Sequence, residues 1–435
     1  MENLYKSGEW GDRLRFLNEL KALVWGTGLI VLLLAAGVYC LLRYGRDMLR
    51  ALRHSERIPL SACLTSLGAA MGTGNIAGVA SALALGGAGA VFWMWAAGLC
   101  GAGLLFAENV LSVRYRRGSC TGAPAYLRYG LGAPLLAGCF SVCCTAASFG
   151  MGCMTQTHTM AVTLQAACAV PPAVTGVLAA GVTAAVILGG AKRIGAFLTA
   201  AVPFVSVVYL LMGLIVIARN GSHLGEAFAA IFRGAFGLDA AIGGIAGEAV
   251  RRAVSVGVRR GVFSNEAGLG SSGLLHSEAD GSPGFLGICA VGELILDTFV
   301  CCTLTALVIL TSGASGNDAD TLVLAAFRTG LGRGADVLLP PVTALFALCT
   351  LIGWSFCGAQ ALRSVTGGRD LTAYRIAFCT AAAAGACFDA AFVWTLADIA
   401  NGLMAYCNLP GVILLTGVPL QGISFPSGEE GSSSA

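Results

Sequence analysis

Charged residues are scarce in this chain. Of its 435 residues, 11% are charged and 56% are hydrophobic, whereas a soluble domain has about 25% charged residues. So small a charged fraction does not cover the surface of a soluble protein of this length. The 61 glycines favour closely packed membrane helices, because small side chains let helix backbones approach one another. The sequence therefore predicts an all-α polytopic membrane protein.

Motifs of covalent, metal and nucleotide chemistry are also lacking. The 17 cysteines include no CxxC pair, and we interpret them as small apolar residues of membrane segments. The sequence contains no HExxH, no GxSxG and no GxxxxGK[ST] motif, which argues against an intramembrane protease and against direct use of ATP. We interpret His158, beside two threonines, as a hydrogen-bonded polar residue. No enzyme activity is expected.

Long apolar runs, in contrast, are abundant. About 20 apolar residues suffice to cross a bilayer, and the sequence predicts eleven transmembrane helices by this measure. They lie at 22–42, 62–82, 88–111, 134–168, 173–190, 195–218, 228–250, 286–312, 335–360, 372–393 and 396–418. Arg259, Arg260, Asn265 and Glu266 interrupt the apolar residues of 253–276, so we interpret that stretch as a surface or re-entrant segment.

Basic residues gather in alternate loops between these runs. The loop after the first run is the richest. Alternate loops after it repeat the pattern with Arg114, Arg116, Arg117 and Arg128, then Lys192 and Arg193, then Arg251, Arg252, Arg259 and Arg260, then Arg363, Arg369 and Arg375. Because basic loops stay in the cytoplasm, we expect a multi-pass protein of the cell (inner) membrane with its N-terminus outside and its C-terminus cytoplasmic. The basic residues of the N-terminal tail do not fit this pattern.

A short internal repeat lies in two of the predicted spans. GTGNIAGVA at 72–80 and AIGGIAGEA at 241–249 share five residues in register. The arginine pattern makes their two spans run in opposite directions. Inverted repeats with glycine-interrupted helices at matching positions are typical of secondary transporters. We therefore expect an N-terminal tail and extra helix at 1–58, five-helix repeats at 59–220 and 221–420, and a polar tail at 421–435.

An interrupted helix at mid-membrane exposes backbone groups, which lipid does not satisfy. Such a break persists where a cavity uses those groups: N–H groups of a half-helix bind a carboxylate, and freed carbonyls bind a cation. The alternative is a GxxxG packing seam through Gly74 and Gly78. The carboxamide of Asn75 argues against a seam, because close helix packing has no need of it.

Seven segments, spread over nearly the whole chain, form a familiar series: GTGNIAGVASALALGGAGAVFWMWAAGLCGAGLLFAENVLSVRYR (72–116), SFGMGCMTQ (148–156), LGGAKRIG (188–195), GVRRGVFSNEAGLGS (257–271), DTFVCCTLTALVIL (297–310), GWSFCG (353–358) and ADIANGLMAYCNLP (397–410). Together they resemble the alanine/glycine:cation symporter family, and FSNEAGLGS is the most specific motif of this resemblance. The resemblance implies a sodium-coupled importer of small neutral amino acids, alanine or glycine, with a LeuT-type fold of five plus five helices.

The same resemblance assigns roles around the two glycine-rich breaks. It implies that Thr73 and Gly74, with Asn75 adjacent, bind the substrate carboxylate. Carbonyls near Gly68 and Met71 would face a sodium ion. Gly243 and Gly244 would form the complementary break, with their carbonyls toward the substrate amine.

Two further helices are implied to close the site. The spacing of Phe149, Cys153 and Gln156 predicts that they share one helix face. Thr350 would add a hydroxyl ligand for sodium, since hard cations prefer oxygen, and Trp354 would wall the pocket. Ordinary helix packing remains the alternative for the two aromatic residues.

An acid inside a membrane span is costly and is a functional candidate by default. Asp297, beside Thr298, is the best such candidate in the chain. A second ion site or relay and a structural hydrogen bond are both compatible with its position.

The chain departs from the family at some of these positions. Cys153 stands where the family usually has Asn, and Cys349 where a second hydroxyl is common. We expect import of alanine or glycine by alternating access, with Na⁺ as the coupling ion. The alternative is a LeuT-type symporter for another amino acid (D-alanine, serine or glutamine), or one driven by protons. The expected partners are the amino acid, sodium and the lipid bilayer, with no nucleic acid.

Overall fold

The computed structural model describes residues 8–53, 60–237, 243–314, 319–368 and 370–416. Within these residues the fold is all-helical and contains no β-strand. The bounds of the helices are α1 (Gly8–Val24), α2 (Thr27–Arg53), α3 (Leu60–Ala70), α4 (Ala77–Gly86), α5 (Gly89–Tyr115), α6 (Gly122–Ala125), α7 (Pro134–Phe149), α8 (Thr155–Cys168), α9 (Pro172–Ile187), α10 (Gly190–Arg219), α11 (Leu224–Phe236), α12 (Gly243–Asn265), α13 (Ser272–Leu275), α14 (Pro283–Leu294), α15 (Thr303–Ser312), α16 (Ala319–Leu331), α17 (Gly334–Thr366), α18 (Thr372–Gly385) and α19 (Ala390–Leu415).

Irregular helical turns join some of these elements. A 3-10 turn, Thr73–Asn75, lies between α3 and α4. π-Helical segments link α7 to α8 (Gly150–Met154) and α14 to α15 (Ile295–Cys302). Each π-helical turn holds an extra residue, so it rotates the faces of the helix on its two sides relative to each other.

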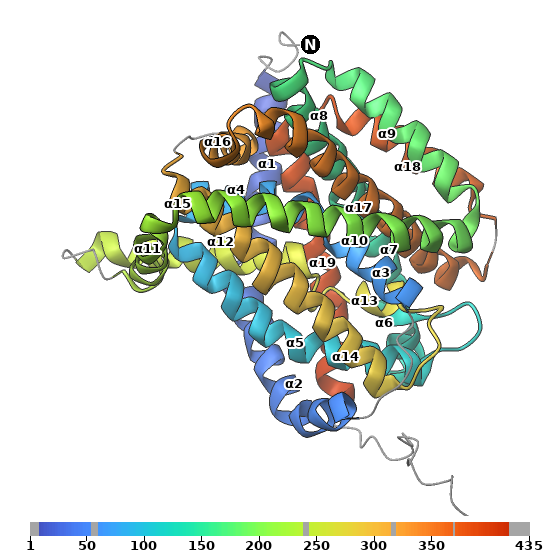
Figure 1. Ribbon diagram of the computed structural model, residues 1–435. Helices are drawn as coiled ribbons and strands as arrows, with labels where there is room; N and C mark the ends of the chain where they lie inside the picture. Colours follow the sequence, from blue (N-terminus) through green and yellow to red (C-terminus); the bar gives the residue numbers. More distant parts are fainter. Residues whose placement is uncertain (1–7, 54–59, 238–242, 315–318, 369, 417–435) are drawn as a thin grey trace, which may run out of the picture.

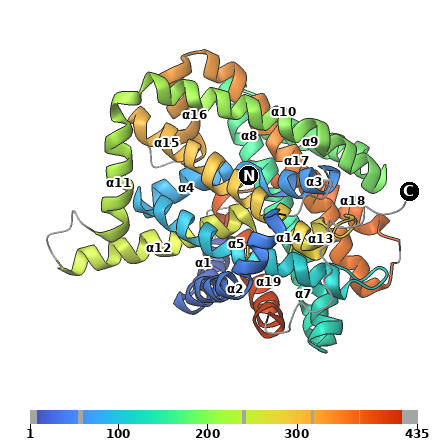
Figure 2. The ribbon, with the colours of Figure 1, turned by 60° about the horizontal axis from the view of Figure 1, so that its bottom comes forward.

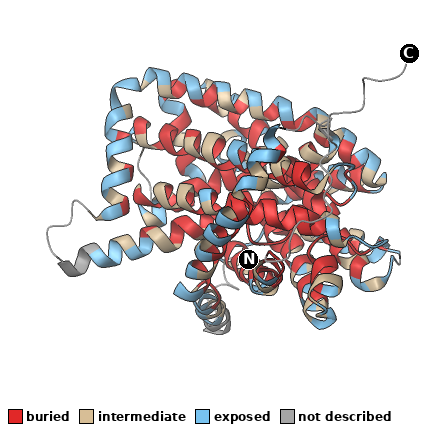
Figure 3. Cartoon of the chain, turned by 90° about the horizontal axis from the view of Figure 1, so that it is seen from below, coloured by how far each residue is buried: buried red, intermediate tan, exposed pale blue. Residues whose placement is uncertain are grey.

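The length and composition of the helices fit a multi-pass membrane protein. Among the described residues, seven helices are long and apolar enough to cross a membrane, and the pair α3–α4, bent by 49° at its break, makes an eighth. Large apolar side chains on the outer helices are exposed, among them Leu178, Phe204 and Leu211, as expected of surfaces that contact lipid. Buried residues fill the centre of the bundle (Figure 3).

The helices pack as a layered bundle. Figure 1 shows α10 crossing the bundle in front of the others, with α9 and α18 side by side at one edge. At the opposite edge α11 leaves the bundle and α12 returns to its centre (Figure 2). The N-terminal helix α1 packs against α19, where the Trp25 indole donates a hydrogen bond to the carbonyl of Asp398 at 2.7 Å.

The predicted span 228–250 is wrong. Helix α11 ends at Phe236, where Gly237 takes a left-handed conformation with φ of 66°, and a separate helix, α12, begins at Gly243. The hydropathy of 228–250 did not reveal this division, because alanine and glycine continue through it. The intervening residues 238–242 lie outside the described part of the chain.

The surface interpretation of 253–276 is also wrong. From Val256 onward this stretch is mostly buried, and α12 packs against α4 and α5 in the middle of the bundle. Its charged residues favour a surface position when only the local sequence is considered, because their partners lie far away in the sequence. A further helix, α16, lies between the predicted spans 286–312 and 335–360.

Candidate functional site

Two interruptions of helices lie against each other in the core. The first, residues 71–76, separates α3 from α4, and the second, residues 266–271, separates α12 from α13. A Cβ atom at Gly74 would lie 3.4 Å from the ring of Phe263 and 3.7 Å from the Cα atom of Ser264. The first interruption therefore rests directly on the C-terminal end of α12.

Left-handed backbone conformations end α12 at the second interruption. Glu266, Gly268 and Gly270 have φ of 58°, 84° and 78°, a left-handed region in which a helix does not continue. Gly270 also lacks space for a side chain, since a Cβ atom would lie 2.9 Å from the carboxamide of Asn408. Glu266 is not a glycine, so its conformation is strained and depends on the contacts of its side chain.

Side-chain carboxamides bind the free backbone N–H groups of the first interruption. Asn75 accepts a hydrogen bond from the N–H of Gly72 at 3.0 Å, and its amide nitrogen donates to Asp297 Oδ1 at 2.6 Å. Thr73 donates twice to Gln156 Oε1, through its N–H at 3.1 Å and its hydroxyl at 2.9 Å. The donors of Thr73 thus converge on one oxygen, the geometry that a carboxylate oxygen would use.

The end of α3 contacts α17. The hydroxyl of Thr350 donates to the carbonyl of Gly68 at 3.1 Å. Gly72 has no room for a side chain: a Cβ atom there would overlap the Thr350 hydroxyl and lie 2.9 Å from Gln156 Oε1. Met71, buried, precedes Gly72 in the chain. Of the three residues predicted for sodium, the structure therefore places Gly68 and Thr350 in direct contact.

Trp354 connects α17 to the second interruption. Its side chain packs on Gly152, where a Cβ atom would overlap it. Its indole N–H donates to Glu266 Oε1 at 2.8 Å, and the hydroxyl of Ser271 donates to Glu266 Oε2 at 2.5 Å. These two donors hold the Glu266 carboxylate, which in turn fixes the strained backbone at this residue.

Asp297 lies where the two interruptions meet. Its fully buried carboxylate accepts hydrogen bonds from Asn75 at 2.6 Å, Ser264 at 2.7 Å and Thr298 at 3.0 Å. Thr298 in turn accepts from Asn265 at 3.2 Å. Asp297 therefore ties the first interruption to the end of α12.

Phe149 and Cys153 lie away from the interruptions. Phe149 packs against the rings of Tyr374 and Phe378 on α18, with centroids 5.6 and 5.8 Å away, and the Cys153 thiol points to the carbonyl of Phe378 at 3.5 Å. The prediction that they share a helix face with Gln156 is wrong, because the π-helical segment between α7 and α8 changes the register of the helix.

Gly243 and Gly244 are far from this site along α12. They are its first two residues, and the helix continues without interruption to Asn265, about 33 Å along its axis at 1.5 Å per residue. Gly243 and Gly244 therefore lie away from the first interruption, and the helix interruption next to it is the one at 266–271.

A small cavity lies beside the interruptions. Its volume is about 10 Å³, close to the space that one water molecule needs. It is lined by Ser66, Ala70, Leu105, Asn265, Glu266, Ser272, Ala290, Glu293, Leu294 and Asp297. The cavity thus lies between α3, α5, α14 and the start of the second interruption.

A buried ion cluster lies about two helical turns before the second interruption. Asp398 of α19 is 3.5 Å from Arg259 and 3.4 Å from Arg260. The guanidinium of Arg260 lies 4.3 Å from the Trp394 ring, and Trp394 stacks with Phe263 at 4.8 Å. Phe263 also contacts the first interruption, so this cluster closes one side of the site.

Sequence reasoning missed Ser264, Glu266 and this ion cluster as parts of the site. The signal was present, because FSNEAGLGS was the most specific of the quoted segments and two arginines precede it in an apolar stretch. Ionisable residues in such a stretch face the protein interior and pair with one another.

The chain is similar to known transporters over nearly all of its length. It is 37% identical to the sodium/alanine symporter AgcS of Methanococcus maripaludis, over 94% of this chain and 96% of that protein. It is 34% identical to the probable sodium/glutamine symporter GlnT of Bacillus subtilis (91% and 87% covered), and 32% identical to the amino-acid carrier protein AlsT of the same species (90% and 87% covered). With residues 12–424 matching the family as a whole, the chain belongs to the sodium:alanine symporter family.

Proposed function

We propose that this protein is a sodium-coupled symporter that imports a small neutral amino acid, alanine or glycine, by alternating access. One observation carries the proposal: the N–H and hydroxyl of Thr73, at an interruption of a membrane helix, converge on the side-chain oxygen of Gln156. A half-helix N-terminus with free donors is a binding site for a carboxylate. Membership of the family supports sodium as the coupling ion.

We further propose a LeuT-type arrangement with eleven transmembrane segments. After the extra helix α2, the first repeat would be α3–α4, α5, α7–α8, α9 and α10. The second would be α12–α13, α14–α15, α17, α18 and α19. Support comes from the position of the two interruptions, which fall in the first segment of each proposed repeat.

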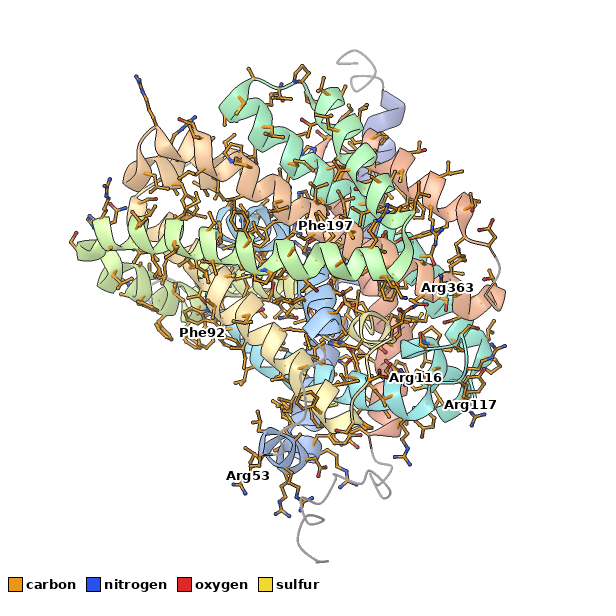
Figure 4. All side chains as sticks on the ribbon, turned by 45° about the vertical axis from the view of Figure 1, so that its right-hand side comes forward. Arg53, Phe92, Arg116, Arg117, Phe197 and Arg363 are labelled. Atoms are coloured by element: carbon orange, nitrogen blue, oxygen red, sulfur yellow. The ribbon has the colours of Figure 1, made fainter. Side chains whose placement is uncertain are left out.

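The proposed orientation keeps the N-terminus outside and the C-terminus in the cytoplasm of a cell membrane. Arg53, Arg116 and Arg117, all from loops predicted to be cytoplasmic, lie in the lower part of the view in Figure 4. Such a grouping is what the retention of positive charge in the cytoplasm produces.

In this proposal, the carboxylate of the substrate replaces the Gln156 oxygen on Thr73 and Gly74, while Asn75 holds the interrupted backbone open. The substrate amine faces the carbonyl end of α12 at the second interruption. Gly152 and Trp354 leave little space on this side, which favours a small side chain. Phe149 and Cys153 then contribute indirectly, by packing against α18.

Sodium would bind between α3 and α17. The carbonyl of Gly68 and the hydroxyl of Thr350 are 3.1 Å apart, and the carbonyl of Met71 belongs to the same broken end. Oxygen ligands of this kind suit a hard cation. Asp297 and Thr298 remain candidates for a second ion site or a relay.

A second candidate function is a symporter for another small amino acid such as D-alanine, serine or glutamine, or one coupled to protons. The relative GlnT, named as a sodium/glutamine symporter, supports the substrate alternative. Cys153 and Cys349, which replace polar groups usual in the family, support a change of substrate or ion.

The test is uptake of labelled alanine by proteoliposomes that contain the purified protein. We expect uptake with an inward sodium gradient, none with potassium in its place, and competition by glycine. Uptake driven by a proton gradient alone, or competition by glutamine and not by glycine, would instead support the second candidate. Empty liposomes and heat-inactivated protein are the controls.

A further inference from the structure

Ligand-type side chains from three elements meet beside α14. The Cys63 thiol on α3, a ring nitrogen of His276 after α13 and a carboxylate oxygen of Glu293 on α14 lie within 4.8 Å of one another. His276 and Glu293 are buried and Cys63 is half-buried. The three elements contact one another in the bundle (Figure 1).

A second thiol lies beside this group of three, next to Cys63. Cys289 lies one helical turn before Glu293 on α14, so both face the same side, and its thiol interacts by a hydrogen bond with Cys63. The set is two sulfurs, one imidazole and one carboxylate. Soft thiolates with an imidazole select zinc-like ions over magnesium or sodium. We propose that Cys63, Cys289, His276 and Glu293 bind one Zn²⁺ ion.

The orientation of His276 supports a cation at this position. Its Nδ1 lies 3.1 Å from the carbonyl of Ser272, and because a carbonyl only accepts hydrogen bonds, Nδ1 carries the proton. Nε2 lies 3.0 Å from Glu293 Oε1. Two acceptors at this distance need a proton between them, carried by the ring or by the carboxyl group, or a metal ion in its place. A backbone carbonyl on the other nitrogen is the usual orienting contact of a zinc-bound histidine.

The dimensions of the cluster fit a tetrahedral ion after a small contraction. Zinc bonds of about 2.0 Å to nitrogen and oxygen and about 2.3 Å to sulfur separate neighbouring ligand atoms by roughly 3.3–3.8 Å. The Cys63, His276 and Glu293 ligand atoms all lie within 4.8 Å of one another, so movements of side-chain atoms by about 1 Å bring them to these separations. Binding releases the thiol protons, so the affinity falls as the pH is lowered.

The bound ion would hold α3 to α13 and α14. In the proposed transport cycle α3 and α13 belong to the two broken segments, and the cavity beside Glu293 leads toward Asp297. Zn²⁺ at this cluster therefore inhibits transport by tying the broken segments to α14. This consequence rests on the proposed function, whereas the binding of zinc does not.

The experiment titrates Zn²⁺ into the full-length, chelator-treated protein in detergent, against a competing chromogenic chelator and in the presence of reductant. We expect one Zn²⁺ per chain. Cys63→Ser and Cys289→Ser should each weaken binding more than about tenfold, whereas Cys168→Ser, at an exposed cysteine on α8, should leave it unchanged. Co²⁺ in place of Zn²⁺ should give a thiolate-to-metal absorption band that is weaker in each single variant and absent when both cysteines are replaced.

Binding that is absent, or that the Cys63 and Cys289 variants retain in full, overturns the proposal. So does a disulfide between these cysteines, detected as two thiols that titrate after reduction and not before it. Alanine uptake with and without micromolar Zn²⁺ is measured separately: zinc binding without any uptake leaves the site intact and contradicts the proposed function instead.

Discussion

The two helix interruptions meet in the core, but different chemistry closes them. At the first, neutral carboxamides serve the free backbone groups: Asn75 binds the N–H of Gly72, and Gln156 binds Thr73. Glycine keeps the space around this segment narrow, because a Cβ atom at Gly72 has no room.

At the second interruption a carboxylate, and not a carboxamide, accepts the hydrogen bonds that hold the segment. Glu266 has a left-handed backbone with φ of 58°, and Trp354 and Ser271 hold its side chain. Because a buried charge that loses its partners costs several kcal/mol, Glu266 is a poor candidate for exchanging ligands.

The first interruption is therefore suited to exchanging hydrogen bonds, and the second to keeping them. A neutral hydrogen bond contributes about 0.5–1.5 kcal/mol to stability, so Thr73 can exchange Gln156 for a substrate carboxylate at low cost. The Glu266 contacts instead form a fixed support for the C-terminal end of α12. Variants at each interruption test this division.

The largest effect is expected from Gly72→Ala at the first interruption. The added methyl group would overlap the Thr350 hydroxyl, and overpacking costs about 1–3 kcal/mol, so alanine uptake should fall by as much as about 150-fold. The matched control is Gly78→Ala, where a Cβ atom meets no atom within 4 Å and uptake should stay within about twofold. Equal uptake by both variants would show that close packing at Gly72 is not needed.

At the second interruption, Glu266→Gln should lower stability rather than affinity. The carboxamide cannot accept from both Trp354 and Ser271 through two oxygens, so the free energy of unfolding should fall by about 1–3 kcal/mol. Thermal unfolding in detergent measures it. Glu248→Gln, at an exposed ion pair with Arg251, is the control and should change stability by less than about 1 kcal/mol. A Glu266 variant that is as stable as the unmodified protein but binds alanine more weakly would show that the second interruption binds substrate and is not only a support.

The sequence predicted the first interruption because its signal is local. Glycines beside Thr73 and Asn75 in an apolar run weaken the helix and supply polar groups at the same place. The identity of the membrane-protein class and many helix positions likewise depend on local apolar length.

The second interruption could not be located in this way because its stability depends on distant residues. In the local sequence, Arg259 and Arg260 indicate a water-exposed surface. In the fold they are buried because they pair with Asp398 on α19. Glu266 similarly depends on Trp354. Nothing local in the sequence gives these pairings. The glycines of 241–249 match the first motif by composition. They therefore placed the predicted second interruption at the start of α12, whereas it lies after the end of this helix.

Gln156→Glu tests whether the Thr73 donors receive a carboxylate. A fixed negative charge there repels the substrate carboxylate by about 1–4 kcal/mol at 4 Å, so the Kd for alanine should rise about tenfold or more. Gln165→Glu makes the same change on the exposed face of the same helix and should leave the Kd unchanged. Equal affinities in direct binding measurements at saturating sodium would mean that the substrate carboxylate binds elsewhere.

Thr350→Val should give the smallest effect and the most selective one. Removal of the hydroxyl takes one oxygen from the proposed sodium site and one hydrogen bond from Gly68, so the sodium concentration for half-maximal uptake should rise roughly threefold to tenfold. Alanine affinity at saturating sodium should not change, because the Thr73 donors remain. Thr343→Val, on the same helix with a buried hydroxyl that bonds to none of the described residues, should leave the sodium dependence as it is. If the two variants behave alike, Thr350 only packs α17 against α3, and the ion must use the carbonyls of the broken helix without it.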